Sequence, residues 1–257
     1  MGSEIKVAMI NGSGERELGE DNQGVFRDAL SAFWSQFYDS CTVGEQERVP
    51  VVRHDYQVPE WTAIARILVK GYKEVKFFPI KLSKIFISAI LFNEKEITKD
   101  FLIESFLCYI SSDERDLVSE VLANKKLSDE QNEEWEDFLE RFKCRKIPKV
   151  EERMEVLLEL SHKEMIQVAQ YIIDSWKEPF KKIQASGMLS TVEDLKQLYE
   201  KSKPTVKKVL GLIEATPSSN AQRGWTMKSW SNFYASVRVQ PSSALRRLQL
   251  ILPTSMG

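Results

Sequence analysis

Three apolar stretches between residues 21 and 92 most constrain what this chain can fold into. In the first, large apolar side chains recur at helical spacing and predict one buried helix face, made of Phe26, Leu30, Phe33, Trp34 and Phe37. In the second, residues 60–72, the apolar side chains again share one side of a predicted helix. The third, residues 82–92, is apolar nearly all round, which predicts a helix buried on every side. We expect these helices to form the core.

Shorter elements are predicted around this core. Residues 5–9 alternate in polarity and predict a strand that ends at Asn11-Gly12, and residues 49–56, punctuated by prolines, predict an extended segment or edge strand. Further helices are predicted at residues 100–110, 113–123, 128–142, 151–160, 164–176 and 191–200, with Pro204 opening one more. Ser128 and Gln131 form a capping-box pattern. The predicted fold class is mainly α with short strands (α+β).

Charge and composition exclude several classes of function. Lys and Arg (36) nearly balance Asp and Glu (38), and this balance disfavours nucleic acid as a partner. Three scattered cysteines and two histidines predict neither a disulfide framework nor a metal site, and no phosphate-binding glycine loop is present, so we expect no cofactor.

The location of the protein is predicted from what its segments lack. The first ten residues do not read as a signal peptide. The longest apolar run, residues 85–92, is far below the ~18 residues needed to span a bilayer, so we expect no membrane partner. We therefore expect an intracellular, cytoplasmic protein, with a nuclear location left open.

Each cysteine and histidine has a structural and a chemical interpretation. Cys144 lies among cations that would lower the pKa of its thiol, but a half-buried thiol at a helix end is favoured. Cys108, on an apolar helix, is expected in the core, and Cys41 in a turn after the aromatic helix. For His54 and His162 we favour packing or capping over catalysis.

Three other segments have distinctive compositions. Residues 214–224, EATPSSNAQRG, are small and polar and are the best candidate for a linker. Residues 225–257 fall below the ~40 that usually fold unaided and are expected to be part of a domain. The acidic residues within 129–140 are expected to form a solvated helix face, and a docking surface for a basic partner is the alternative.

In the opening quarter of the chain, the predicted strand at residues 5–9 is followed by a loop that contains Asp21 and Gly24, and Arg27 lies in the helix start. This order resembles the HECT-type ubiquitin ligases, in which a strand leads into an Asp-and-double-Gly turn and then an Arg-bearing helix. Gln23 stands where the first glycine of the pair would be.

The following segments extend the resemblance. Residues 60–71 and 77–92 are similar to the family's pair of helices around a short loop with a proline. Two stretches, ARILVKGY and HKEMIQ with the YIIDSW that follows, resemble the divergent HECT-like proteins abundant in fish. The resemblance covers nearly the whole chain and is more specific in residues 5–92 than in residues 100–215.

The resemblance implies a bilobal architecture. Residues 1–215 would form a large helical N-lobe that binds a ubiquitin-conjugating enzyme, with contacts expected within residues 95–185. Residues 216–224 would be the hinge, and residues 225–257 part of a small α/β C-lobe.

The end of the sequence resembles the motif that precedes the family's catalytic cysteine: Leu252, Pro253, Thr254 and Ser255. By that register the cysteine would follow Gly257, so the resemblance implies a C-lobe cut short just before its nucleophile. Transthiolation needs a thiolate that accepts ubiquitin as a thioester. We therefore expect no catalytic residue in this chain. The resemblance is to a family of ubiquitin-protein transferases, but it implies that this chain is itself inactive.

Three functional hypotheses follow. The first is a HECT-like ubiquitin ligase domain that binds a ubiquitin-conjugating enzyme, with ubiquitin as a further candidate partner and a substrate protein that the sequence does not identify. The second is a non-catalytic interaction protein that competes for conjugating enzymes or ligase partners. The third is an unrelated helical adaptor that shares only a packing pattern with the family.

Overall fold

The computed structural model describes residues 9–10, 16–17, 22–92, 94–123, 125–144 and 147–205. Within them the α-helices are α1 (Asn22–Cys41), α2 (Val58–Val75), α3 (Lys84–Leu91), α4 (Lys99–Tyr109), α5 (Ser112–Leu122), α6 (Asp129–Arg141), α7 (Arg153–His162), α8 (Gln170–Gln184) and α9 (Val192–Ser202). Short helical turns are η1 (Glu94–Glu96), η2 (Val150–Glu152) and η3 (Lys163–Gln167). The strands are β1 (Met9–Ile10), β2 (Arg16–Glu17), β3 (Thr42–Val43) and β4 (Val49–Pro50). The prediction of a mainly α fold with short strands is confirmed.

The chain divides into two compact units, and the larger comprises residues 27–203. The other unit contains the antiparallel ladder of β1 and β2, in which Met9 pairs with Glu17 and Ile10 with Arg16. The strand predicted at residues 5–9 is confirmed at Met9 alone, because residues 1–8 lie outside the described residues.

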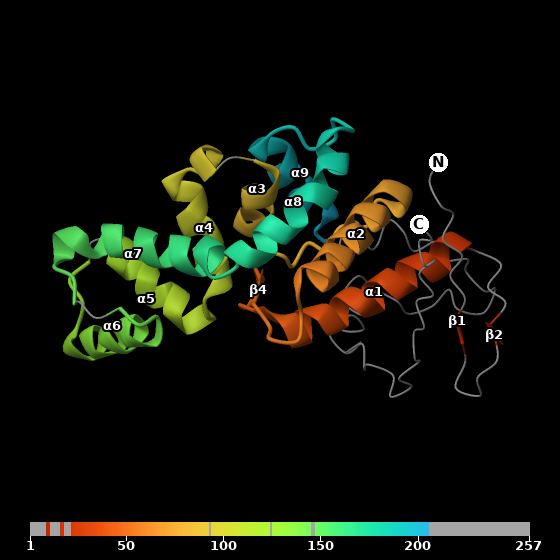
Figure 1. The fold of residues 1–257 in the computed structure, drawn as a ribbon. Helices are drawn as coiled ribbons and strands as arrows, with labels where there is room; N and C mark the ends of the chain where they lie inside the picture. The colour runs from red at the N-terminus through yellow and green to blue at the C-terminus, as the bar shows by residue number, and fades with distance from the viewer. Residues whose placement is uncertain are drawn as a thin grey trace, which may run out of the picture. The chain divides into compact units, whose positions relative to one another are not determined.

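The core of the larger unit is built on α2, α3 and α8, which pack side by side with α9 and α1 alongside (Figure 1). All eight residues of α3 are buried, as its apolar sequence predicts. On α1 the buried face includes Leu30, Trp34 and Phe37, whereas Phe26 and Phe33 of the predicted face are only half-buried; on α2 the buried face includes Trp61. Burying one such large side chain stabilises the fold by about 1.5–3 kcal/mol, so the three predicted core helices carry much of the hydrophobic stabilisation.

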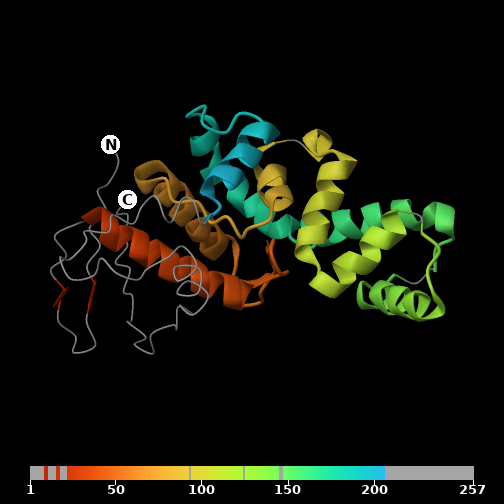
Figure 2. The same ribbon diagram turned by 180° about the vertical axis from the view of Figure 1, so that it is seen from behind.

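A second group of helices, α5, α6 and α7, lies at the end of this unit away from α2 and α9 (Figures 1 and 2). Helix α4 joins the groups, since the ring of Phe106 lies 6.4 Å from that of Phe138 and 5.6 Å from that of Phe142. The capping box predicted at Ser128 is confirmed: the Ser128 side chain accepts a hydrogen bond from the Gln131 N–H, and the Gln131 side chain accepts one from the Ser128 N–H.

The helix predicted at residues 151–160 is confirmed to within two residues by α7, but the prediction of a helix from residue 164 to residue 176 is wrong. Helix α7 continues into η3, a π-helical turn, and α8 then runs to Gln184 with Pro179 inside it. Because a π turn adds a residue, the apolar periodicity changes phase there, and the change resembles a break between helices. Proline lacks the N–H that would bond the Ser175 carbonyl, but the Thr62 hydroxyl donates to that carbonyl at 3.4 Å.

Several boundaries also differ from the predictions. Helix α1 begins at Asn22 and extends through Cys41, so Cys41 is the last residue of the helix and is buried, not in a turn. Of the extended segment predicted at residues 49–56, only β4 is a strand, paired with β3 through Thr42–Pro50 and Val43–Val49. The helices predicted at residues 100–110, 113–123 and 191–200 are confirmed to within two residues.

Candidate functional site

An open groove of about 770 Å³ lies in the larger unit where the β3–β4 hairpin meets α4, α6 and η3. From the hairpin and the α4–α5 corner come Val43, Gly44, Glu45, Arg48, Tyr109 and Ser111. From the end of α6 and from η3 with the residue after it come Arg141, Phe142, Lys143, Lys163, Glu164 and Val168. A concave surface of this size, with apolar and charged side chains together, is suited to binding.

The hairpin wall is attached to the end of α4 through the backbone. The N–H of Glu45 donates to the carbonyl of Tyr109, and the N–H groups of Gln46 and Glu47 donate to that of Cys108, each at 3.0 Å. These carbonyls belong to the last turn of α4, where carbonyl groups have no hydrogen-bond donor within the helix. The hairpin therefore caps the helix and is held against it.

Gly44 makes the close approach of hairpin and helix possible. Its φ is 111°, a conformation that side chains disfavour. A Cβ atom there would lie 2.2 Å from the Glu47 carbonyl oxygen and 2.6 Å from Cδ2 of Tyr109. Only glycine fits at this position.

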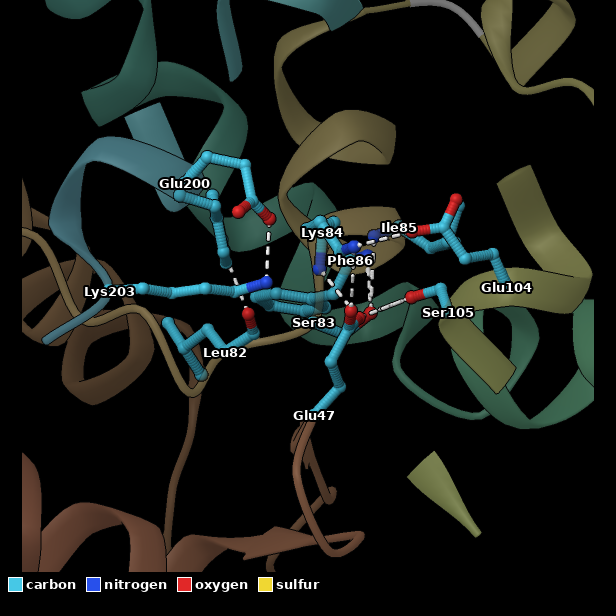
Figure 3. Close-up of polar contacts among 11 residues, drawn as sticks. Glu47, Leu82, Ser83, Lys84, Ile85, Phe86, Glu104, Ser105, Glu200 and Lys203 are labelled. Atoms are coloured by element: carbon cyan, nitrogen blue, oxygen red, sulfur yellow. Dashed lines mark hydrogen bonds and ion pairs between the residues drawn. The ribbon is translucent and has the colours of Figure 1, made fainter. Parts of the chain in front are cut away.

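Glu47 fixes the hairpin to α3 and α4 through a buried polar cluster (Figure 3). Its carboxylate accepts hydrogen bonds from the Lys84 N–H at 3.0 Å and from the Ser105 hydroxyl, and it lies 3.3 Å from Lys84 Nζ. Ser83 caps α3 by accepting from the Ile85 and Phe86 N–H groups. The Glu47 carboxylate thus lies at the positive end of the α3 dipole.

Burial sets the electrostatics of this cluster. It raises the pKa of Glu47, although the Ser105 hydroxyl and Lys84 favour the carboxylate. Burial by itself would lower the pKa of Lys84, but the carboxylates of Glu47 and Glu104 outweigh it and raise that pKa. The Glu47 side chain is 7% exposed and does not line the groove, so the cluster positions the hairpin and does not meet a ligand itself.

The opposite wall is the end of α6. The N–H of Lys143 donates to the Glu140 carbonyl at 2.7 Å and that of Cys144 to the Leu139 carbonyl at 2.9 Å, the pattern of a Schellman motif. The left-handed residue of that motif is usually glycine, but here it is Lys143, with φ 58°. A lysine in this conformation costs about 1–2 kcal/mol and places its side chain at the groove.

The π turn η3 forms the third part of the wall. The Val168 N–H reaches back five residues to the Lys163 carbonyl at 3.0 Å. The Lys163 ammonium donates to the Phe142 carbonyl at 2.7 Å and so ties η3 to the end of α6. Single π turns occur frequently at functional sites, and this one supplies Lys163, Glu164 and Val168 to the groove.

Most charges of the groove are matched by neighbours. Arg141 lies 2.7 Å from Glu114, and Glu45 lies 3.9 Å from Arg115. Glu164 lies 3.4 Å from the Lys163 ammonium. It also accepts a 3.5 Å hydrogen bond from the hydroxyl of Tyr109, whose pKa burial raises to about 12.

Two groove cations, Arg48 and Lys143, have no carboxylate within ion-pairing distance among the described residues. The Arg48 Nε donates to the Thr42 hydroxyl at 2.9 Å, which orients the guanidinium but leaves its charge unmatched. The arrangement can bind and orient a partner.

The cysteines are distributed over separate elements. Cys41 is buried, and its Sγ lies 3.4 Å from the Ser40 hydroxyl. The prediction of Cys108 in the core is wrong: the residue is half-buried, because it lies at the edge of the buried face of α4 and not on it. Burial and the nearby Glu47 raise the pKa of its thiol. Cys144 is half-buried just beyond α6, as predicted.

The remaining predicted residues lie away from the groove or outside the described residues. His54 is exposed in the loop after β4, and the Nε2 of His162 lies 3.4 Å from Glu94. The acidic side chains of α6 are exposed, as expected for a solvated face: Asp129, Glu130, Glu133, Glu134, Glu136, Asp137 and Glu140. The segments at residues 214–257, including the motif at Leu252 to Ser255, lie outside the described residues, as does the helix predicted after Pro204.

Sequence reasoning missed the groove. Its hairpin had a signal, since β-branched Thr42, Val43 and Val49 flank a turn that contains Gly44. The left-handed conformation of Lys143 had none, because lysine is rare at that position.

Within the described residues, no cluster of three or more histidine, cysteine or acidic side chains could hold a metal ion. The same residues include no helix with the length and apolar character required to cross a membrane. No family model, curated protein or solved structure matches this chain.

Proposed function

We propose that this chain is a HECT-like ubiquitin ligase domain that binds a ubiquitin-conjugating enzyme in the groove between the β3–β4 hairpin and the end of α6. The helical unit of residues 27–203 would belong to the N-lobe, and the hinge and C-lobe would follow it. The observation that carries this proposal is the groove itself: most of its lining falls within residues 95–185, the segment that the resemblance assigns to the conjugating enzyme.

We further propose that the chain does not carry ubiquitin itself. The sequence has three cysteines. Cys41 is buried, and the pKa of the Cys108 thiol is raised, which disfavours the thiolate that transthiolation requires. Cys144 is half-buried at a helix end. Binding without transfer is therefore the expected behaviour.

The second candidate function is a non-catalytic protein that competes for conjugating enzymes or for partners of active ligases. The same placement of the cysteines favours it. A competitor is expected to lower the rate at which an active HECT ligase discharges its conjugating enzyme, and to lower it further as the concentration of this chain rises.

The test measures binding and transfer separately. The chain is titrated against a panel of ubiquitin-conjugating enzymes, and then incubated with the ubiquitin-charged forms. Binding without a reducible ubiquitin adduct is expected. Val43→Asp, in the groove, should weaken binding, whereas Val52→Asp should not, because Val52 is similarly exposed but does not line the groove.

Two results would count against these proposals. Absence of affinity for every conjugating enzyme would count against both candidate functions. An adduct that Cys144→Ala removes and Cys108→Ala preserves would show that the chain does carry ubiquitin.

A further inference from the structure

The groove offers two cations that the fold itself does not neutralise. Arg48 and Lys143 line it from opposite walls, and no carboxylate among the described residues pairs with either. The two acidic groups of the lining, Glu45 and Glu164, have Arg115 and Lys163 as neighbours. The net charge available to a ligand is therefore positive.

Both cations are held by fixed backbone. The Arg48 N–H donates to the Lys81 carbonyl at 2.7 Å, and the Arg48 carbonyl accepts from the Ser83 N–H at 2.8 Å, so the residue is joined to the start of α3. Lys143 is held by the Schellman motif in a conformation that lysine disfavours. The fixed backbone sets where each side chain begins, and the Arg48 guanidinium is also oriented by its hydrogen bond to the Thr42 hydroxyl, so Arg48 loses less freedom when it binds.

Exposed apolar side chains lie among these charges. Val43 is 43% exposed and Val168 is 42% exposed, on the hairpin and after η3 respectively. A ligand that covers both would remove apolar surface from water at about 25 cal/mol per Å², while its charged groups meet the cations. Apolar contact and anion binding are therefore both available.

We propose that the groove binds a short acidic segment of a partner protein, with carboxylates at Arg48 and Lys143 and a bulky apolar side chain against Val43 and Val168. A basic segment would meet like charges. A long polyanion such as nucleic acid is disfavoured, because α6 beside the groove exposes a face of carboxylates and the formal net charge of the chain is -2. This inference rests on the proposed function, from which it takes a protein as the partner. What it adds is the chemistry of the segment that docks in the groove.

The test uses the whole chain labelled with ¹⁵N and three matched peptides. The first is a heptapeptide of Asp and Glu around one central Phe; the second has Lys for each acid, and the third has Ser for the Phe. The acidic Phe peptide should shift groove amides and bind at least about fivefold tighter than either counterpart, because it alone matches both the charge and the apolar surface. A single-stranded oligonucleotide is the fourth probe.

Variants locate the contacts. Arg48→Met and Lys143→Gln should each weaken the acidic peptide about tenfold, the loss of one charge-assisted contact. Lys76→Gln, an exposed lysine that is also left-handed and does not line the groove, should leave binding unchanged. If Arg48→Met does not fold, Lys143→Gln decides the question, because its side chain is exposed.

The inference is overturned if the Lys peptide binds as well as the acidic one, if the oligonucleotide alone shifts the groove amides, or if Lys143→Gln binds like the unchanged chain. Its failure is distinguishable from failure of the proposed function. If a conjugating enzyme binds the Lys143→Gln variant normally and no acidic peptide binds the chain, the proposed function stands and the inference about the acidic segment is overturned. If the acidic peptide binds as expected and no conjugating enzyme binds, the inference stands and the proposed function is overturned.

Discussion

Lys143 has opposite effects on stability and on binding, and this conflict can be measured. Its left-handed backbone costs free energy that glycine avoids, so Lys143→Gly should raise the free energy of unfolding by about 0.5–1 kcal/mol, after the greater freedom of glycine in the unfolded chain is deducted. The same change should weaken the acidic peptide, because a groove cation is lost. Urea unfolding and peptide titration measure the two effects. Lys76→Gly is the control: it should stabilise similarly and leave binding intact.

Two glycines with positive φ test whether the hairpin needs close approach or only backbone freedom. Gly44→Ala should destabilise by about 3 kcal/mol or more, because the new Cβ meets Glu47 and Tyr109. Gly187→Ala should cost only about 1 kcal/mol, since φ is 67° but no atom lies within 4 Å of its Cβ. Chemical denaturation measures both. Equal losses would mean that backbone freedom alone, and not close approach, requires glycine at position 44.

At the scale of elements, the β3–β4 hairpin should depend on one buried carboxylate. Glu47→Gln removes the charge opposite Lys84 but leaves Lys84 with Glu104 at 3.1 Å. We therefore expect the free energy of unfolding to fall by about 2–3 kcal/mol, less than when a buried ion loses its only partner. Hydrogen exchange at Glu45 and Gln46 should accelerate more than exchange in α2. Glu178→Gln, in an exposed pair with Lys181, should change stability by less than about 0.5 kcal/mol.

The start of α9 should respond to pH through its capping box. The Thr191 hydroxyl and the N–H groups of Ser190 and Thr191 lower the pKa of Asp194, so its ionised form is favoured in the fold. A lowered pKa contributes stability above the unfolded value of about 3.9, and this contribution is lost as pH falls through the folded pKa. The Tm advantage over Asp194→Asn should therefore be full at pH 7 and shrink below pH about 4. An advantage independent of pH would contradict this assignment.

Helices in this chain were predictable where short-range rules and burial agree. The buried stripe on α1, the uniformly apolar α3 and the capping box at Ser128 all express local patterns that tertiary packing then uses. The bounds of α8 were not predictable, because η3 shifts the apolar periodicity and because the Thr62 hydroxyl donates to the carbonyl that Pro179 leaves without a donor. The contact with Thr62 joins residues far apart in sequence, and sequence periodicity carries no information on such contacts.

At the scale of the molecule, the groove was beyond sequence reasoning for a related reason. Its cations, Arg48 and Lys143, come from separate elements and line the same groove only when the hairpin is fixed against α4. The acidic face of α6 was predictable because its charges lie on one helix. Sequence patterns thus identified surfaces made by single elements, whereas the groove, made by the β3–β4 hairpin, α4, α6 and η3, required the fold.

The larger unit should unfold as one cooperative body although its helices form two groups. Trp34, Trp61 and Trp176 lie in the group around α2, and Trp135 lies in α6; all four are almost completely buried. Phe106 joins the groups through its ring contacts with α6. A polypeptide of residues 22–205 should therefore give coincident urea transitions by circular dichroism and tryptophan fluorescence.

Trp135→Phe separates the two groups in this experiment. The variant removes the fluorescent reporter of α6 at a modest cost in volume, so its transition reports on the other group alone. If the unit is cooperative, the midpoint from fluorescence still equals that from circular dichroism in the variant, even where both shift downward. A fluorescence midpoint that lies above the circular dichroism midpoint would mean that α5, α6 and α7 unfold first. The groove would then be lost before the core, because one of its walls is the end of α6.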